Sequence, residues 1–130
     1  MGLASTEIET VAEEEVYAFV RQSIGSVWTL ELLLLLQRNN ARVWQADELV
    51  RELRSSQTIV DEGLARLRAA GLLSESDGGY IYRPASPDLQ RLADDLQRIY
   101  AAKPISVVKA IMTAPNDKLR IFSDAFKLKD

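Results

Sequence analysis

The sequence predicts a mainly α-helical fold that contains one small β-hairpin, and three observations lead to this prediction. Residues 46–70 hold two amphipathic helical segments separated by a short polar break, and Val60, Leu64 and Leu67 repeat at helical spacing in the second. Asp77-Gly78-Gly79 is a tight-turn sequence between two short segments suited to β-strands. Further apolar rows at helical spacing lie on both sides of this region, so we expect flanking helices towards both ends of the chain.

The composition limits the range of functions. With 130 residues, of which 47% are hydrophobic and 27% charged, the chain is long enough for one globular domain with its own core. It contains no cysteine and no histidine. Disulfides, thiol chemistry, histidine-dependent catalytic triads and typical zinc sites are therefore excluded. We expect a protein that is not an enzyme and that holds no metal ion and no cofactor.

The acidic character of the chain belongs to its N-terminal segment. The formal net charge is −3. Residues 1–15 contain five glutamates and no basic residue, so they carry −5 and the other 115 residues carry +2. Runs of like charge are commonly solvated. We therefore favour a solvated helix start over an acidic arm that mimics nucleic acid or holds a basic partner.

Two helices are expected before residue 40. Apolar residues at helical spacing predict a helix up to Ile24, and Gly25-Ser26 interrupts the pattern. Ser26 is placed to cap a second helix, from 27 to about 39, that is apolar nearly all round and should form the centre of the core. We expect Asn39-Asn40 to end it in the left-handed conformation that asparagine tolerates. Its apolar residues are Trp28, Leu30, Leu32, Leu33, Leu34, Leu35 and Leu36.

The middle of the chain predicts the order strand, helix, turn, helix, hairpin. Residues 41–44 are expected to form a short strand that pairs with the hairpin, with Trp44 in the core. A helix begins at Gln45 or Asp47, a polar break follows at residues 54–56, and the next helix ends at Gly71. The first of these helices presents Leu49, Val50 and Leu53, and the hairpin strands contain Leu72-Leu73 and Tyr80-Ile81-Tyr82.

Three helical segments are expected after the hairpin. Ser86-Pro87 is a helix-start sequence, and an amphipathic helix follows to about Ala102. Pro104 separates it from a second helix, whose apolar residues are Ile105, Val108, Ile111 and Met112. A break at residues 114–117 precedes a last apolar row, which consists of Leu119, Ile121, Phe122, Ala125, Phe126 and Leu128.

The order helix, short turn, helix and hairpin resembles a winged helix-turn-helix. Within it, Leu64-x-x-Leu67-x-x-x-Gly71-Leu72 looks like the end of the recognition helix in MarR-like bacterial transcriptional regulators. The resemblance covers about residues 26–83. It implies a winged helix-turn-helix core at 26–85, with an N-terminal acidic helix at 1–25 and C-terminal helices at 86–130, all in one compact domain. It further implies a transcription regulator that binds double-stranded DNA.

The flanking helices exceed what a compact winged core needs. In bacterial winged-helix regulators such helices commonly form the dimer, and two-fold homodimers are the commonest assembly. We therefore expect a homodimer built from the N-terminal helix and residues 89–128. The alternative is that these helices only wrap the monomer.

The resemblance places the outward face of the helix after the break in the DNA major groove. Gln57 would then read adenine, and Arg66 a guanine or a phosphate. Ser55, Ser56 and Thr58 would donate to phosphates at the helix start. The candidate DNA-binding residues are Arg54, Ser55, Ser56, Gln57, Thr58, Arg66 and Arg83, and a cluster in space of Arg54, Arg66, Arg68 and Arg83 would favour binding.

The same region also carries carboxylates that oppose DNA binding. Residues 41–83 contain six arginines and seven acidic residues, which give a net charge of −1. Acidic side chains beside phosphates usually repel them. The alternative function is therefore a winged-helix protein-interaction module, whose acidic surface for a basic protein partner consists of Asp61, Glu62, Glu75 and Asp77.

Neither a secretory signal nor a membrane span is evident, because the N-terminus is acidic and the longest apolar run is residues 32–36. We therefore expect a cytoplasmic protein without membrane contact.

For Trp28, Tyr100 and Phe122, helical spacing favours a place in the core over the walls of a small-molecule cleft. Asp94-Asp95 point about 100° apart on a helix and are expected to be solvated rather than to share a metal ion.

Overall fold

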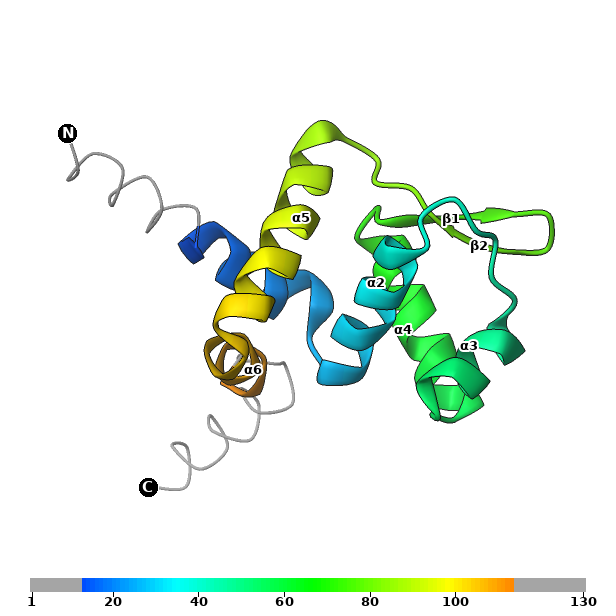
Figure 1. Ribbon diagram of the computed structural model, residues 1–130, viewed down its shortest axis with the longest axis horizontal. Coiled ribbons are helices and arrows are strands. Elements are labelled where there is room, and N and C mark those ends of the chain that lie inside the picture. The colour runs from blue at the N-terminus through cyan, green and yellow to red at the C-terminus, as the bar shows by residue number, and fades with distance from the viewer. Residues whose placement is uncertain (1–12, 114–130) are drawn as a thin grey trace, which may run out of the picture.

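A computed structural model of the chain describes residues 13–113, which form a mainly helical fold with one small antiparallel sheet (Figure 1). This confirms the predicted fold class at the level of helices with a β-hairpin. The described part of the chain begins with a helix over residues 13–19 that continues into a π-helical turn, η1. The elements are η1 (Val20–Ile24), α2 (Val27–Arg38), α3 (Ala46–Leu53), α4 (Gln57–Ala69), β1 (Leu73–Ser76), β2 (Gly79–Tyr82), α5 (Pro87–Ala102) and α6 (Pro104–Met112).

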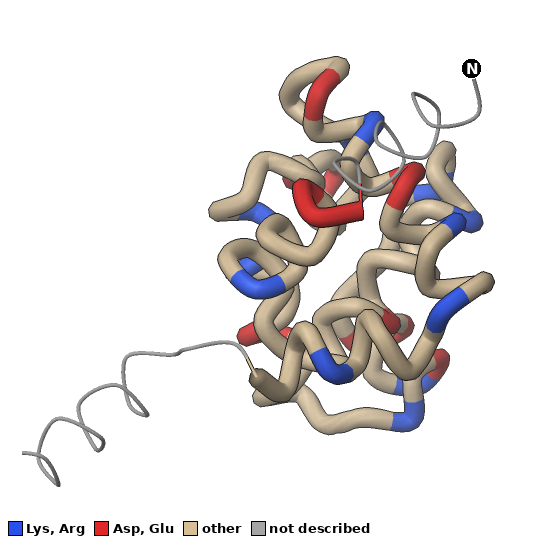
Figure 2. The backbone as a smooth tube through the Cα atoms, turned by 90° about the vertical axis from the view of Figure 1, so that its left-hand side faces the viewer, with Lys and Arg blue, Asp and Glu red and all other residues tan. Residues whose placement is uncertain are grey.

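Ion pairs join the first helix to the C-terminal helices. Glu13 Oε1 accepts a hydrogen bond from Lys103 Nζ at 2.9 Å, and Glu15 Oε2 accepts one from Arg91 Nη2 at 3.1 Å. The predicted solvated helix start therefore has specific partners as well. Acidic and basic positions are interspersed along the part of the chain seen in Figure 2. Ion pairs at a surface contribute little free energy, about 1 kcal/mol or less each, so these pairs orient the helices more than they hold them together.

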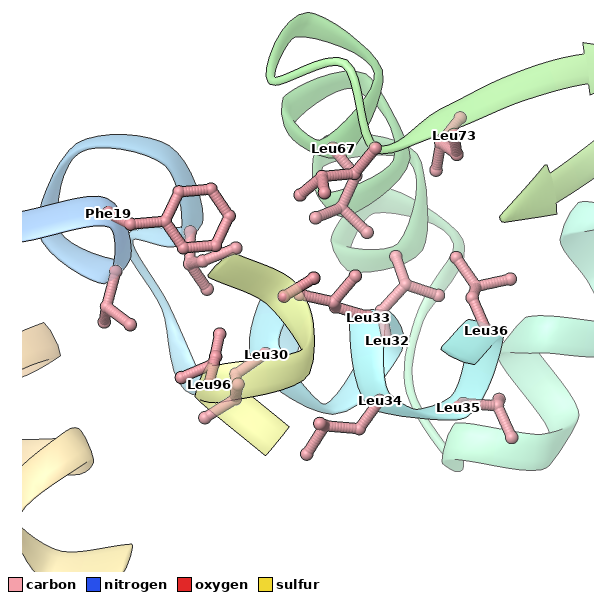
Figure 3. Packing of buried hydrophobic residues seen from close by; sticks show 14 of the residues in the cluster. Phe19, Leu30, Leu32, Leu33, Leu34, Leu35, Leu36, Leu67, Leu73 and Leu96 are labelled. Atoms are coloured by element: carbon pink, nitrogen blue, oxygen red, sulfur yellow. The ribbon is translucent and has the colours of Figure 1, made fainter. Parts of the chain in front are cut away.

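Helix α2 is the centre of the core, as predicted. Ser26 Oγ accepts a hydrogen bond from Thr29 N at 3.1 Å and caps the helix. The helix packs most extensively against α4, and it also contacts α3, β2 and η1. Its leucines point in several directions among these neighbours, as Figure 3 shows. The buried leucines of α2 are Leu30, Leu32, Leu33, Leu34, Leu35 and Leu36.

Two predictions about α2 are wrong. Trp28 was expected in the core, yet 44% of its surface is exposed, because its side of the first turn of α2 borders an open groove, whereas Thr29 and Leu30 in the same turn are buried. Asn39 was expected to be left-handed, yet its φ is −125°. Its side-chain Nδ2 instead donates to Leu35 O at 3.1 Å, so the asparagine satisfies one of the last carbonyls of the helix directly.

The segment α3–turn–α4 follows from caps and apolar spacing. Gln45 is the N-cap of α3, and Gln45 and Glu48 form a reciprocal capping box. Ser56 Oγ accepts from Ile59 N at 3.2 Å and caps α4. Between the helices, Arg54 takes a left-handed φ of 53°, which the sequence did not predict because arginine rarely adopts it. The predicted inward row of α4, Val60, Leu64 and Leu67, is buried.

The carboxyl group of Glu48 gives a testable pH dependence. Hydrogen bonds from the Gln45 backbone amide and from the Arg42 side chain lower its pKa below the ordinary value of 4.5. Because the pKa is lowered in the folded chain, this stabilisation is present above the unfolded pKa and is lost as the pH falls through the folded pKa. An NMR titration should find the Glu48 pKa below 4.5 and should show it rising in Arg42→Gln. An unchanged pKa in that variant would contradict the contribution of Arg42.

The hairpin has the predicted position and a two-residue turn. Strands β1 and β2 pair antiparallel, from Leu73 opposite Tyr82 to Ser76 opposite Gly79. Asp77 and Gly78 have φ values of 50° and 76°, so both central turn residues are left-handed, as a type I′ hairpin turn requires. Gly79, which we assigned to the turn, is the first residue of β2.

The predicted strand at residues 41–44 is reduced to one bridge. Trp44 pairs antiparallel with Tyr80, and its N–H and C=O each form a 2.8 Å hydrogen bond with that residue. Trp44 is buried, as predicted, and the guanidinium of Arg42 lies 3.6 Å from its ring centroid. The bridge fixes the hairpin to the connection between α2 and α3.

Helices α5 and α6 begin where the sequence predicts. Ser86 Oγ accepts from Leu89 N at 3.2 Å, and a proline opens each helix. The predicted apolar face of α6 is partly wrong, because Ile105 and Met112 are 73% and 72% exposed. The stripe that packs against α5 and η1 is instead Val107, Ala110 and Ile111. The predicted helix at residues 119–128 lies outside the described residues.

Within residues 13–113, no single helix has the length and apolar character needed to cross a membrane. Glu13–Ile24 and Val27–Arg38 reach that size and hydropathy only when taken together, and the chain bends by 106° between them.

Candidate functional site

The outward face of α4 is exposed, as its period predicts. The same 3.6-residue repeat that buries Val60, Leu64 and Leu67 turns the intervening positions to solvent. This face lies on the opposite side of α4 from α2, its main packing partner. The exposed positions are Gln57, Thr58, Asp61, Glu62, Ala65, Arg66, Arg68 and Ala69.

A groove runs along one side of this face, between α4 and the start of α2. It has a volume of about 700 Å³ and is open to solvent along its length. The half-exposed ring of Trp28 and the side chain of Ile59 give it apolar walls, and Glu62 adds a carboxylate. The sequence analysis considered a cleft near Trp28 but favoured a place in the core for this residue, and the groove contradicts that choice for Trp28. The available signal was the position of Trp28 in the first turn of α2, ahead of the buried stretch.

Arg66 has a structural role that the sequence did not reveal. Its Nε donates to Ser23 O and its Nη2 donates to Gln22 O, both at 3.2 Å. These carbonyls belong to the last turn before Gly25, where backbone acceptors lack helical partners. The guanidinium lies so close to Gly25 that a Cβ there would be 2.7 Å from its Cζ. Arg66 is therefore held against the end of η1, and its predicted role as a reader of guanine or phosphate conflicts with these bonds.

Replacing Arg66 with alanine is expected to lower the free energy of unfolding by about 1 kcal/mol, because two carbonyls lose a charged donor at a partly solvated position. Urea unfolding followed by circular dichroism measures the loss. Arg68→Ala is the matched control on the same helix, since Arg68 forms only an exposed ion pair with Glu75 and should cost less. Equal losses in the two variants would contradict the structural role of Arg66.

The arginines of this region do not form one cluster. Arg68 Nη1 lies 2.6 Å from Glu75 Oε1 on β1, and Arg66 is bound to backbone carbonyls. Arg54 precedes α4, whereas Arg66 lies roughly 14 Å along the helix from its first residue, Gln57. Within residues 13–113, Arg54 and Arg83 form no ion pair, and both are exposed. Two of the four arginines considered as a cation cluster, Arg66 and Arg68, are therefore engaged with other groups.

Some of the polar side chains at the start of α4 already form hydrogen bonds within the protein. Ser56 Oγ caps the helix, and Gln57 Nε2 donates to Asp61 Oδ1 at 2.8 Å. Ser55 Oγ is buried, with no hydrogen-bond partner among the described residues. Thr58 is exposed. Thr58 is therefore the candidate at this end whose hydroxyl is neither buried nor used as the cap, and Gln57 must release Asp61 before it can read a base.

The four acidic candidates do not act as one patch either. Glu75 is paired with Arg68, and Asp61 accepts from Gln57. Asp77 stands apart in the hairpin turn, and Glu62 alone borders the groove beside Trp28. Glu62 is therefore the acidic candidate placed to act together with an apolar surface.

Carboxylates elsewhere have structural partners. Asp95 lies 3.8 Å from Arg91 and 3.2 Å from Arg98 on the same helix, so its neighbour Asp94 does not share a site with it. Among residues 13–113, no group of three or more potential ligands is placed to hold a metal ion.

Comparison of the chain with protein-family models, with curated proteins and with solved structures finds no match.

Proposed function

We propose that the chain is a DNA-binding transcription regulator that uses a winged helix-turn-helix, with α4 as the recognition helix and the β1–β2 hairpin as the wing. The observation that carries the proposal is the arrangement α3–turn–α4–hairpin, in which α4 buries one row on α2 and leaves the other side exposed. The Trp44–Tyr80 bridge supports it, because a strand before α3 pairs with the wing in such domains.

In this proposal the start of α4 contacts the DNA backbone. Arg54 and Thr58 are exposed beside the first-turn amides, where the helix dipole favours an anion. Arg83, at the end of the hairpin, adds a second unpaired guanidinium. Asp61 and Arg68 lie one turn and three turns further along α4, and in this proposal they would meet base edges after release from Gln57 and Glu75.

The charge distribution predicts weak binding with a shallow salt dependence. The two arginines of the proposed surface that form no ion pair within residues 13–113, Arg54 and Arg83, would neutralise about two phosphates, so log K should fall with log salt at a slope of about −2 per subunit. Between about 50 and 200 mM salt this corresponds to roughly a tenfold loss of affinity per subunit.

A homodimer belongs to the same proposal. DNA-binding dimers of this kind place two recognition helices about 34 Å apart, one helical turn of DNA. Light scattering of the full chain at micromolar concentration tests the assembly, and a mass close to one 14.6 kDa protomer would rule it out.

Fluorescence anisotropy with labelled random duplex DNA tests the function. The full chain should bind at low salt, and the double variant Arg54→Gln with Arg83→Gln should bind several-fold more weakly with a flatter salt dependence. Arg98→Gln is the matched control, because it removes an exposed arginine from α5, away from the proposed surface. If the folded wild-type chain binds no duplex at low salt, DNA binding is excluded.

The groove beside Trp28 favours a second candidate, a protein-interaction module. The groove combines an exposed tryptophan and apolar walls with the Glu62 carboxylate and the Arg66 guanidinium, which suits a mainly apolar partner segment with a basic side chain that reaches Glu62. Such a partner would be bound by Trp28 and Glu62. Trp28→Ala would then abolish binding to the partner while leaving any DNA affinity unchanged.

A further inference from the structure

Helix α6 is apolar on two sides, but the described chain covers only one of them. Val107, Ala110 and Ile111 are buried against α5 and η1. On the other side, Ile105 and Met112 are 73% and 72% exposed. A shallow hollow of about 280 Å³ lies on this side. An exposed row of large apolar residues on one helix face usually marks a contact surface.

The sequence after α6 contains a matching apolar row. Ile105, Val108 and Met112 are spaced by three and then four residues. Leu119, Phe122 and Phe126 have the same spacing. If the chain reverses between them, the pairs Met112–Leu119, Val108–Phe122 and Ile105–Phe126 share one midpoint, at residues 115–116. The two rows therefore match in an antiparallel hairpin, position by position.

We propose that residues 118–128 form a helix that packs antiparallel on the outer face of α6 of the same chain. Residues 114–117, Ala-Pro-Asn-Asp, are turn-forming, and the five residues 113–117 between the two helices fall within the usual length of a helix–helix connection. Eleven residues of helix span roughly 16 Å, and the nine residues of α6 span roughly 14 Å, so the lengths agree.

The short connection favours the same chain over a second copy. A segment tethered by a few residues has an effective concentration in the millimolar range, far above working protein concentrations. The opposite side of the segment would carry Arg120, Asp124 and Lys127 together with Ile121 and Leu128, so polar groups there can contact water. The outer face of α6 is also small beside the roughly 800 Å² per partner that a standard protein–protein interface buries, so it does not by itself favour a dimer contact.

Paired cysteines test this proposal cleanly, because the natural sequence contains none. The full-length variant Ile105→Cys with Phe126→Cys is treated with a short bis-maleimide and separated by denaturing electrophoresis. The expected result is a cross-link within one chain, detected as loss of both free thiols at monomer mass. Met112→Cys with Leu119→Cys should give the same product. Because this variant keeps Phe126, it tests the proposal even if replacing Phe126 disturbs the packing.

Asp124 supplies the matched control. Ile105→Cys with Asp124→Cys places the second thiol on the far side of the segment, so it should cross-link much more slowly. Cross-links at dimer mass between positions 105 and 126 would overturn the proposal by placing the segment on a second copy. Equal rates for the Phe126 and Asp124 pairs would also overturn it, because they would show no preferred face. Neither outcome depends on whether the chain binds DNA.

Discussion

Replacing Gly63 with leucine is expected to lower the free energy of unfolding by about 3 kcal/mol, the upper end of the usual cost of overpacking. Gly63 is buried in the middle of α4, where it faces α2. A Cβ at this position would lie 2.9 Å from Leu32 Cδ2 and 3.6 Å from Thr29 Oγ1. Three further carbon atoms cannot enter this contact without moving the two helices apart. Because α2 also contacts α3, β2 and η1, that movement disturbs packing on several sides.

Gly63→Ala is the matched control for this prediction. Alanine is favoured over glycine by about 1 kcal/mol inside a helix. The atom its Cβ would meet most closely is the end of the Leu32 side chain, which can rotate away. The two effects oppose each other, so Gly63→Ala should stay within about 1 kcal/mol of the natural chain. Urea unfolding measures both variants, and a Gly63→Leu chain as stable as the Gly63→Ala chain would show that the helices are not in close contact here.

The sequence predicted the helices themselves, but it did not predict how closely α2 and α4 approach each other at Gly63. Local signals were sufficient for the helices, because serine caps, prolines at helix starts and apolar spacing act within a few residues. The burial of Val60, Leu64 and Leu67 followed from the same spacing. The closeness of α2 and α4 at Gly63 did not, because it depends on residues some thirty positions apart in the chain.

In the candidate site too, features that depend on local spacing were predictable and contacts between distant residues were not. Exposure of the α4 face was predictable from its period alone. The bonds of Arg66 to Gln22 and Ser23 were not, since they join positions more than forty residues apart. Trp28 was misplaced for a related reason: composition indicated a helix apolar all round, but whether the first turn is covered depends on which helices reach it. The sequence therefore predicted which face of α4 is exposed, but not the hydrogen bonds of Arg66 or the exposure of Trp28.

Replacing Gly79 with alanine is expected to cost about 2 kcal/mol and to detach the hairpin from the segment before α3. A Cβ at Gly79 would lie 2.6 Å from the carbonyl oxygen of Trp44 and 2.8 Å from Val43 Cγ1. The first of these atoms is backbone and cannot rotate away. It can move only if the two 2.8 Å hydrogen bonds between Trp44 and Tyr80 lengthen or break.

Amide hydrogen exchange is the most direct measurement for Gly79→Ala, because the amides of Trp44 and Tyr80 are the donors of the two hydrogen bonds in the bridge. Exchange at the amides of Trp44 and Tyr80 should accelerate, while amides in the middle of α2 keep their protection relative to global unfolding. Gly78→Asn is the control in the neighbouring turn, where a Cβ meets no atom within 4 Å and asparagine tolerates the φ of 76°. Unchanged exchange at Trp44 in Gly79→Ala would mean that the hairpin is positioned by its own strands rather than by this bridge. The proposed wing would then be free to move relative to α4, and the Arg83 contact proposed for DNA would lose its fixed distance from Arg54.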